Sequence, residues 1–161
     1  MFVIVNKTDS RILKVLQRDG RITNRDLANK VALSPSPCLV RRKRLEETGI
    51  IRGYQAMLDL KRAAPLVLVN AEVTLERNTL ASSQNFEKYI QAEPSVIHAL
   101  AVSGTIDYIL TFCVPTLADY QQISDKMIEE TGVVETLTSH TALDEIKPFS
   151  GYPLDLLLNE S

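Results

Sequence analysis

Beyond residue 65 the hydrophobic positions switch repeatedly between a spacing of two residues and the wider spacing of a helix. In residues 66–76 every second residue is apolar, which predicts a strand with one buried face. Residues 82–93 carry apolar side chains at helical spacing and stop before Pro94, so we expect a helix capped by Ser82 or Ser83. The pattern therefore predicts mixed helix and strand structure.

The same pattern predicts further elements downstream. Strands are expected over residues 96–103, 108–114 and 133–143, and a helix capped by Thr116 should run to Gly132. The order strand, helix, strand, strand, helix, strand is that of a ferredoxin-like βαββαβ fold with both helices on one sheet face. The other face would be uncovered and partly apolar, which favours a homodimer formed through the sheets.

Three short helices are predicted in the first fifty residues. The first covers residues 9–19 with Thr8 as its cap, and the second follows a cap at Thr23. The third runs over Ser34–Thr48, with Gly49 as its stop signal. Because so few residues separate the second helix from the third, the two should cross steeply with the first packed behind them. That arrangement is a tri-helical helix-turn-helix.

The predicted fold class is α+β, in three parts. A winged helix-turn-helix DNA-binding domain covers residues 1–52, and a linker strand or small hairpin, the wing, follows over residues 53–65. A ferredoxin-like effector and oligomerisation domain covers residues 66–161. Its C-terminal tail is too apolar to stay in solvent, so we expect it to dock as an extra strand or to cross to a neighbouring subunit.

The third helix concentrates positive charge in little more than one turn. Helical geometry spreads Arg41–Arg44 around most of the circumference, so at least two cations must face solvent or an anion. A short basic helix fits the DNA major groove, where Arg and Lys contact phosphates and guanine edges. A solvated charge run or a nuclear localisation signal are the alternatives. The candidate DNA contacts are Ser34, Ser36, Arg41, Arg42, Lys43, Arg44 and Arg52.

The distribution of charge supports a nucleic-acid-binding half. Residues 1–62 contain 14 Lys and Arg against 6 Asp and Glu, a net charge of +8. The remaining residues contain 4 and 14, a net charge of −10, which gives the −2 of the whole chain. Phosphate would repel the acidic half, so that half should face away from DNA.

Other functional classes find little support. The chain has no apolar run of membrane-spanning length and no signal-peptide pattern, so we expect a cytoplasmic protein. Cys38 and Cys113 are isolated, which argues against a disulfide or a thiolate metal site, and Cys38 is expected in the core. Phosphate-loop, zinc-protease and nucleophile-elbow motifs are absent, so we expect neither an enzyme nor a metal or other cofactor.

The segment SGTIDY at Ser103–Tyr108 is a candidate site for a small ligand. Gly104 would let a carboxylate approach backbone N–H groups, and Asp107 could accept an ammonium group. That pairing suits a free amino acid. Taken alone, however, a strand-to-strand loop with Asp is more often a simple turn.

Six segments together resemble a known family. They are DxRIL at Asp9–Leu13, DGRITNRDLA at Asp19–Ala28, LSPSPC at Leu33–Cys38, RLEETGII at Arg44–Ile51, GY at Gly53–Tyr54, and SGTIDY. Nearly the whole chain is thus similar to the Lrp/AsnC, or feast/famine, transcription regulators of prokaryotes. One departure concerns the basic helix. The family usually has an aliphatic residue at Arg42 and a polar one at Val40. Either Arg42 extends its head into water from the inner face, or the helix rotates locally.

The resemblance implies an amino-acid effector, such as leucine or methionine, bound between dimers that assemble into octamers. The pocket would combine the loop with part of the last strand of a neighbouring subunit. Carried over by position, the effector-binding residues are Ser103, Gly104, Thr105, Asp107, Tyr108, Thr136, Thr138 and Ser139. The resemblance thus implies a regulator whose binding to duplex DNA responds to a free amino acid.

Two other functions remain open. The first is an architectural DNA-binding protein without an effector response. The second is a tetrapyrrole decarboxylase, because some haem-biosynthesis enzymes resemble the same family and use histidines. The only histidines here are His98 and His140, both on predicted strands, and such an enzyme would not need the basic helix.

Overall fold

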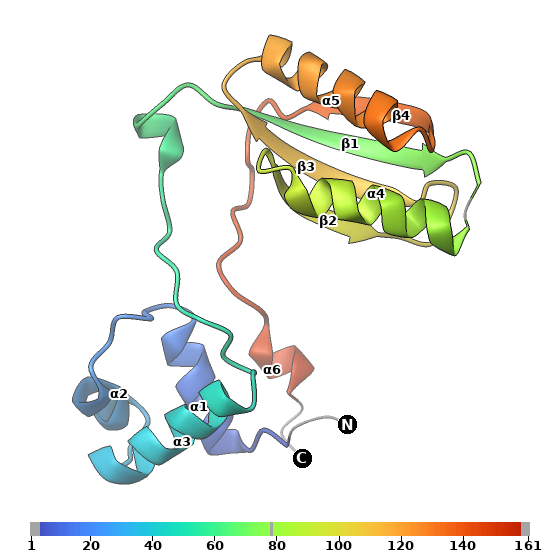
Figure 1. The fold of residues 1–161 in the computed structure, drawn as a ribbon. Coiled ribbons are helices and arrows are strands. Elements are labelled where there is room, and N and C mark those ends of the chain that lie inside the picture. The colour runs from blue at the N-terminus through green and yellow to red at the C-terminus, as the bar shows by residue number, and fades with distance from the viewer. Residues whose placement is uncertain (1–3, 78, 159–161) are drawn as a thin grey trace. The chain divides into compact units, whose positions relative to one another are not determined.

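The structure, a computed structural model, describes residues 4–77 and 79–158 (Figure 1). These residues form two compact units. The helical unit comprises residues 4–57 together with residues 147–158, and the sheet unit comprises the described residues from 58 to 146.

Three helices build the helical unit: α1 (Lys7–Leu16), α2 (Asn24–Lys30) and α3 (Pro35–Glu47). Their apolar faces meet in one core, so the tri-helical arrangement predicted from the sequence is confirmed. The buried core residues are Ile12, Leu16, Ile22, Leu27, Ala28, Val31, Cys38 and Leu45.

The ends of α1 differ from the prediction. Asn6, rather than Thr8, is the N-cap, because its side chain accepts hydrogen bonds from the N–H groups of Thr8 and Asp9. The Asp9 carboxylate in turn accepts the Asn6 N–H, which completes a capping box. The helix therefore starts at Lys7, and it ends at Leu16 rather than at residue 19.

The turn from α2 to α3 is tight. Thr23 caps α2 as predicted, accepting the Asp26 N–H at 3.1 Å. After α2, Ala32 adopts a φ of +55°, a value that side-chain-bearing residues rarely adopt. The Leu33 N–H then donates to the Ala28 carbonyl at 2.9 Å. This turn lets α3 begin only a few residues after α2 ends.

The predicted linker strand is wrong. Residues 52–59 have no regular secondary structure, and Leu60–Arg62 forms a single 3-10 turn, η1. The alternation that suggested a strand is interrupted at Met57, and Met57 and Leu58 are largely exposed. With no neighbouring strand among the described residues to pair with, the backbone of this segment gains nothing from extended geometry.

The sheet unit contains β1 (Val67–Leu75), β2 (Val96–Ala101), β3 (Tyr108–Val114) and β4 (Val134–Thr141). The strand order is β2-β3-β1-β4, and every neighbouring pair is antiparallel. One helix connects β1 to β2 and another connects β3 to β4. The predicted ferredoxin-like fold is therefore confirmed.

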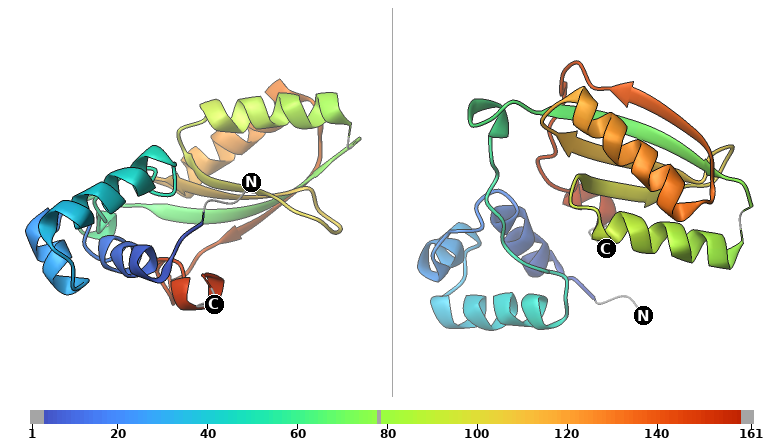
Figure 2. Two further views of the ribbon diagram at one scale, coloured as in Figure 1. Left: turned by 90° about the horizontal axis from the view of Figure 1, so that it is seen from below. Right: turned by 45° about the horizontal axis from the view of Figure 1, so that its top comes forward.

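The connecting helices, α4 (Leu80–Ala92) and α5 (Leu117–Thr131), lie on the same face of the sheet (Figure 2). Thr79 is the N-cap of α4 and accepts the Ser82 N–H, so the prediction of Ser82 or Ser83 as the cap is wrong. The caps of α5 are as predicted, with Thr116 at its start and a left-handed glycine at its end. The buried core residues beneath the helices are Val69, Ala71, Val73, Leu75, Phe86, Ile90, Tyr108, Leu110, Phe112, Val114, Tyr120 and Met127.

Neither α4 nor α5 covers the other side of the sheet, which we term the open face. The strand register places on it Leu68, Asn70, Glu72 and Thr74 of β1, Ile109, Thr111 and Cys113 of β3, His98 and Leu100 of β2, and Thr136, Thr138 and His140 of β4. This face is mixed rather than uniformly apolar. For example, the Thr111 hydroxyl donates to Asn70 at 2.9 Å.

The C-terminal segment belongs to the helical unit and does not form the extra strand that was expected. It contains the short helix α6 (Leu154–Leu157). The side chain of Gln17, the C-cap residue of α1, pairs with both backbone groups of Tyr152 at 3.1 Å. Lys14 forms an ion pair with Asp155. The tail thus docks through side chains of α1, which can satisfy its backbone without a strand partner.

Candidate nucleic-acid interface and effector site

The inner face of α3 fixes which side of the helix faces outward. Cys38 and Leu45 are fully buried against α1 and α2, and burial raises the pKa of the Cys38 thiol. Cys38 is thus a core residue, as expected. Ser34 occupies the N-cap position, but its side chain makes no capping hydrogen bond.

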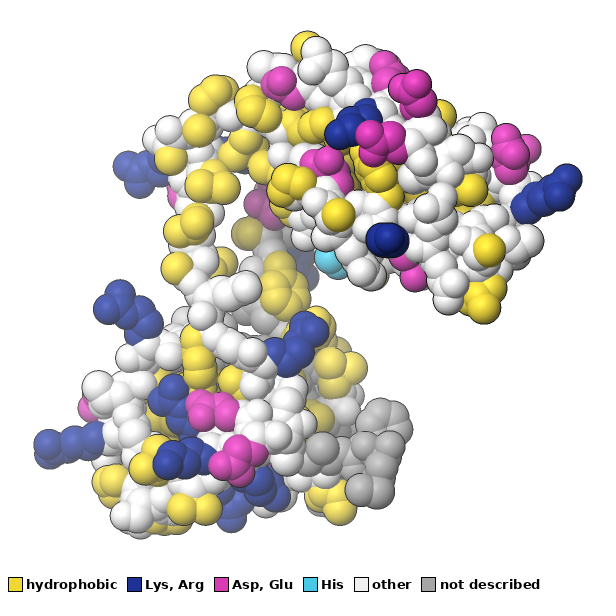
Figure 3. Space-filling view, in the orientation of Figure 1, with side chains coloured by type: hydrophobic (Ala, Val, Ile, Leu, Met, Phe, Trp, Pro, Cys, Tyr) yellow, Lys and Arg dark blue, Asp and Glu magenta, His cyan; other side chains and the backbone are white. Residues whose placement is uncertain are grey.

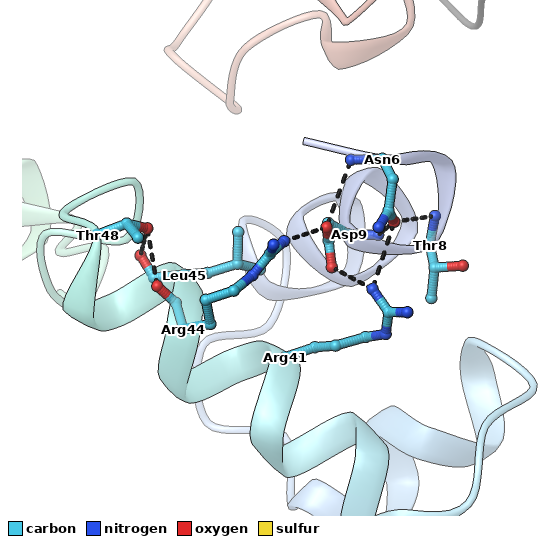
Figure 4. Close-up of polar contacts among 7 residues, drawn as sticks. All are labelled: Asn6, Thr8, Asp9, Arg41, Arg44, Leu45 and Thr48. Carbon is cyan, nitrogen blue, oxygen red and sulfur yellow. Dashed lines mark hydrogen bonds and ion pairs between the residues drawn. The ribbon is translucent and has the colours of Figure 1, made fainter. Parts of the chain in front are cut away.

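The arginines at positions 41 and 44 converge on one carboxylate of α1 (Figure 4). The Asp9 side chain has 0% exposed surface, and Arg41 donates to its Oδ1 at 3.0 Å. Arg44 forms an ion pair with the other oxygen, Oδ2. These contacts fasten α3 to α1. The arginine side chains remain 35% and 45% exposed, so part of each guanidinium still reaches solvent.

Arg42 adopts neither of the two arrangements that the sequence left open, which were a head extended into water and a local rotation of the helix. Its Nε donates to Glu46 Oε1 and to the Tyr54 hydroxyl, each at 3.0 Å, and its guanidinium lies 4.9 Å from the Tyr54 ring centroid. The side chain is only 20% exposed, and its head is bound to Glu46 and Tyr54 rather than extended into solvent. The helix is not rotated either, because Cys38 and Leu45 keep the inner face.

Burial and hydrogen bonding within this group shift three pKa values. The Tyr54 hydroxyl donates to Glu46 at 2.8 Å, and this bond together with Arg42 lowers the pKa of Glu46. Burial and the bond to Glu46 raise the pKa of Tyr54. Burial alone would lower the pKa of Arg42, but its contacts with Glu46 and Tyr54 outweigh that effect and raise it. All three groups therefore keep their usual charge near neutral pH.

Opposite the buried face, α3 presents a row of side chains that we term the outer ridge. At 100° per residue, positions 36, 40, 43 and 47 fall within one narrow sector, away from Cys38 and Leu45. The outer ridge consists of Ser36, Val40, Lys43 and Glu47, all of which are exposed. Arg52 lies beyond α3 and is also exposed. In Figure 3 the Lys and Arg side chains gather over the helical unit.

The loop between β2 and β3 has a fixed backbone. Gly104 adopts a φ of +135°, which favours glycine, although a Cβ there would meet no atom within 4 Å. Asp107 Oδ2 accepts the Leu75 N–H at 2.8 Å, and the Asp107 N–H donates to the Val73 carbonyl at 2.9 Å. Asp107 thus ties the loop to the end of β1, while Ser103 and Thr105 are exposed beside it.

Two of the predicted effector-binding residues point to the helix-covered side. Tyr108 is buried, donates to Glu87 at 3.0 Å and packs on Phe86. Ser139 bonds to the Tyr120 hydroxyl beneath α5. Tyr108 and Ser139 are therefore separated from Thr136 and Thr138, which lie on the open face. The parity of β4 in the sequence could have separated Ser139 from its neighbours.

Other features are less suited to bind a ligand. A pocket of about 380 Å³ lies between α4 and β2. Tyr108 lines it, but residues 103–107 do not. His98 and His140 lie on opposite edge strands of the sheet, so they cannot share a site within one chain. Within the described ranges, no three His, Cys, Asp or Glu side chains are close enough to hold a metal ion. No helix among the described residues has the length and apolarity to cross a membrane.

Comparisons with known proteins match both units. Residues 5–52 match the family described as winged helix-turn-helix DNA-binding, and residues 68–152 match the Lrp/AsnC ligand binding domain. The chain is 39% identical to the leucine-responsive regulatory protein of Haemophilus influenzae over 140 residues, covering 86% of this chain and 84% of that protein. The protein of the same name from Escherichia coli K12 is 35% identical over 144 residues, covering 89% and 87%.

Solved structures agree in fold over almost the full chain. A transcriptional regulator of Neisseria meningitidis, solved as a complex with L-Met, matches with a TM-score of 0.88 and 34% identity, covering 96% of this chain and 100% of that one. An AsnC family regulator of Agrobacterium tumefaciens also has a TM-score of 0.88, with 31% identity and coverage of 95% and 99%.

Proposed function

The chain belongs to the Lrp/AsnC family of transcription regulators, and we propose that its α3 helix enters the major groove of duplex DNA. It is an amino-acid-responsive DNA-binding transcription regulator rather than an enzyme. The observation that carries the proposal for α3 is the outer ridge, an exposed row on the third helix of a helix-turn-helix with cations on and beside it.

The exposed candidate residues divide between the groove and the DNA backbone. Ser36 projects from the outer ridge, so in this proposal it enters the groove with α3, and Lys43 on the same ridge reaches a phosphate along the groove. Ser34 lies at the start of the helix and Arg52 beyond its end. These two side chains would contact the phosphates on either side of the helix.

The three arginines of the basic run have different roles. Arg41 and Arg44 would reach phosphate with the part of each guanidinium that remains exposed beside Asp9. Arg42 instead holds the start of the linker through Tyr54 and would make no direct DNA contact. Within the basic run, phosphate binding is therefore assigned to Arg41 and Arg44 and not to Arg42.

Salt dependence of binding tests the DNA interface. Removing one phosphate contact should lower the slope of log affinity against log salt by about 0.9. We expect this change for Lys43→Gln and Arg52→Gln, whereas Lys126→Gln on α5 removes the same charge from the sheet unit and should leave the slope unchanged. Unchanged slopes in both of the first two variants would contradict the assignment of α3 as the DNA-contacting helix.

The effector site is proposed at the loop of residues 103–108. The exposed Ser103, Gly104 and Thr105 would contact a free amino acid, and Asp107 holds the loop in place through β1. Open-face residues of a neighbouring subunit, with Thr136 and Thr138 as candidates, would complete the pocket.

The effector is proposed to be leucine or methionine. The relatives from Haemophilus and Escherichia are leucine-responsive regulators, and the Neisseria regulator was solved with L-Met. The protein would work in the cytoplasm as a homodimer formed through the open face, and the dimers would assemble into octamers. Residues 1–52 would bind DNA, while residues 66–146 would bind the effector and hold the subunits together.

A thermal-shift panel of the common amino acids tests the effector site. A ligand at roughly 100 times its dissociation constant adds about 2.7 kcal/mol of stability. We expect leucine or methionine to raise the melting temperature, Thr138→Val to weaken that response, and Ser139→Ala, on the covered face, to retain it. If no amino acid shifted the transition, the architectural function would be favoured instead.

A further inference from the structure

The outer ridge of α3 contains an exposed apolar side chain where the proposed function places DNA. Val40 is 67% exposed, and its neighbour Leu39 is 41% exposed. An aliphatic residue of a helical core would normally be buried, and the core positions of α3 are already filled by Cys38 and Leu45. Packing within the described chain therefore does not account for the valine at position 40.

The charged side chains beside Val40 are turned toward the protein. Arg41 and Arg44 bind the buried carboxylate of Asp9, and Arg42 binds Glu46 and Tyr54. These contacts hold the three guanidinium groups at the flanks of the helix. The centre of the outer ridge is consequently occupied by an uncharged methyl-bearing side chain, between Ser36 on one side and Lys43 on the other.

The charges along the outer ridge also indicate which of its ends lies closer to the DNA. Glu47 at the C-terminal end would be repelled by phosphate, whereas Ser36 and Val40 lie in the N-terminal half of α3. In a helix-turn-helix, the N-terminal residues of the recognition helix contact the base edges. Val40 therefore lies at the position on α3 from which a base in the groove is contacted.

The chemistry of the major groove offers one apolar partner. Among the base edges, only thymine presents a methyl group there, and small apolar side chains pack on it. We propose that Val40 is a specificity-determining residue that contacts a thymine 5-methyl group. This inference rests on the proposed function of α3. Val40 selects the base, while Arg41 and Arg44 at the flanks bind phosphate without regard to sequence.

Deoxyuridine scanning tests the proposal, because deoxyuridine lacks only the thymine methyl group. The probe is the duplex most enriched by the wild-type full chain from a random library, with each thymine replaced in turn at one fixed salt concentration. Burial of one methyl group corresponds to about a fourfold change in affinity. At one or more positions the wild type should lose about fourfold, and Val40→Ala, which withdraws the side-chain methyl groups toward the helix, should reduce that difference. Alanine is a good helix former, so this exposed substitution preserves α3.

Lys43→Gln is the matched control on the same ridge. It should weaken binding to all duplexes alike and keep the wild-type discrimination between thymine and deoxyuridine. The inference is overturned if no thymine position is sensitive in the wild type, or if Val40→Ala retains the full sensitivity. In both cases duplex binding survives and only the role of Val40 fails. If the chain bound no duplex at all, the proposed function would fail together with the inference.

Discussion

Replacing the buried carboxylate of Asp9 should loosen the helical unit. Asp9→Asn keeps the side-chain shape and one acceptor oxygen for the Asn6 N–H, but it removes the charge that Arg41 and Arg44 share. Removing one partner of a buried ion pair typically costs about 3–5 kcal/mol. Here the arginines are 35% and 45% exposed and regain water when released, so we expect a smaller loss of about 2 kcal/mol.

Urea unfolding followed by circular dichroism measures this loss. Asp19→Asn is the matched control, because Asp19 lies in an exposed turn after α1 and should change the free energy of unfolding by less than about 0.5 kcal/mol. A double-mutant cycle then isolates the contact. Asp9→Asn and Arg44→Gln should couple by about 1 kcal/mol or more, whereas Asp9→Asn and Lys43→Gln should be additive. The reasoning is refuted if Asp9→Asn is as stable as Asp19→Asn.

Three further predictions concern other parts of the chain. Tyr54→Phe removes a hydroxyl that donates to Glu46, and should lower the free energy of unfolding by about 1 kcal/mol in the same urea assay. The pKa of Glu46 in the folded protein lies below its ordinary value of 4.5. The ionised Glu46 therefore stabilises the fold above pH 4.5, and this stabilisation is lost as the pH falls through the folded pKa. Glu46→Gln should remove this part of the acid sensitivity. Gly104→Ala should destabilise the protein by about 1–3 kcal/mol in thermal unfolding, because the φ of Gly104 is +135°. Gly53→Ala is the control, because Gly53 also has open space around it but no such φ, and it should not destabilise the protein. Equal effects of the two variants would contradict this reason.

Two strands of the sheet unit, β1 and β3, could be predicted with their register because apolar residues alternate along them. In β1 and β3 every second residue is apolar and buried, so the register of the core face follows from the residue parity alone. The same parity already assigned Tyr108 to the core side with Leu110. The effector assignment by resemblance overlooked this constraint, and the structure shows Tyr108 bonded to Glu87 beneath α4.

The ion pairs of the helical unit could not be predicted from the sequence in the same way. The start of α1 had a local signal, since Asn6 and Asp9 have the spacing of a capping box. The burial of Asp9 had none, because its partners are more than thirty residues away and the contact depends on how α3 crosses α1. The sequence therefore showed that α3 is basic, but not that all three of its arginines are held by carboxylates of the protein.

The strand predictions for the linker and the tail were wrong for a different reason. Both segments are apolar enough to suggest strands, yet a strand forms only where another strand offers its backbone groups. In the tail, Gln17 provides that pairing from a helix, through both backbone groups of Tyr152. Side chains that substitute for a neighbouring strand leave no periodic trace in the sequence.

In the proposed function, one chain couples a DNA-reading helix to an amino-acid site. The most direct test is the affinity of the full chain for its selected duplex at fixed salt, measured without effector and with saturating leucine or methionine. Coupling between two such sites typically changes affinity by about 5–150-fold, and we expect a change in this range for at least one of the two amino acids. Duplex affinity that stayed the same in the presence of both would contradict it.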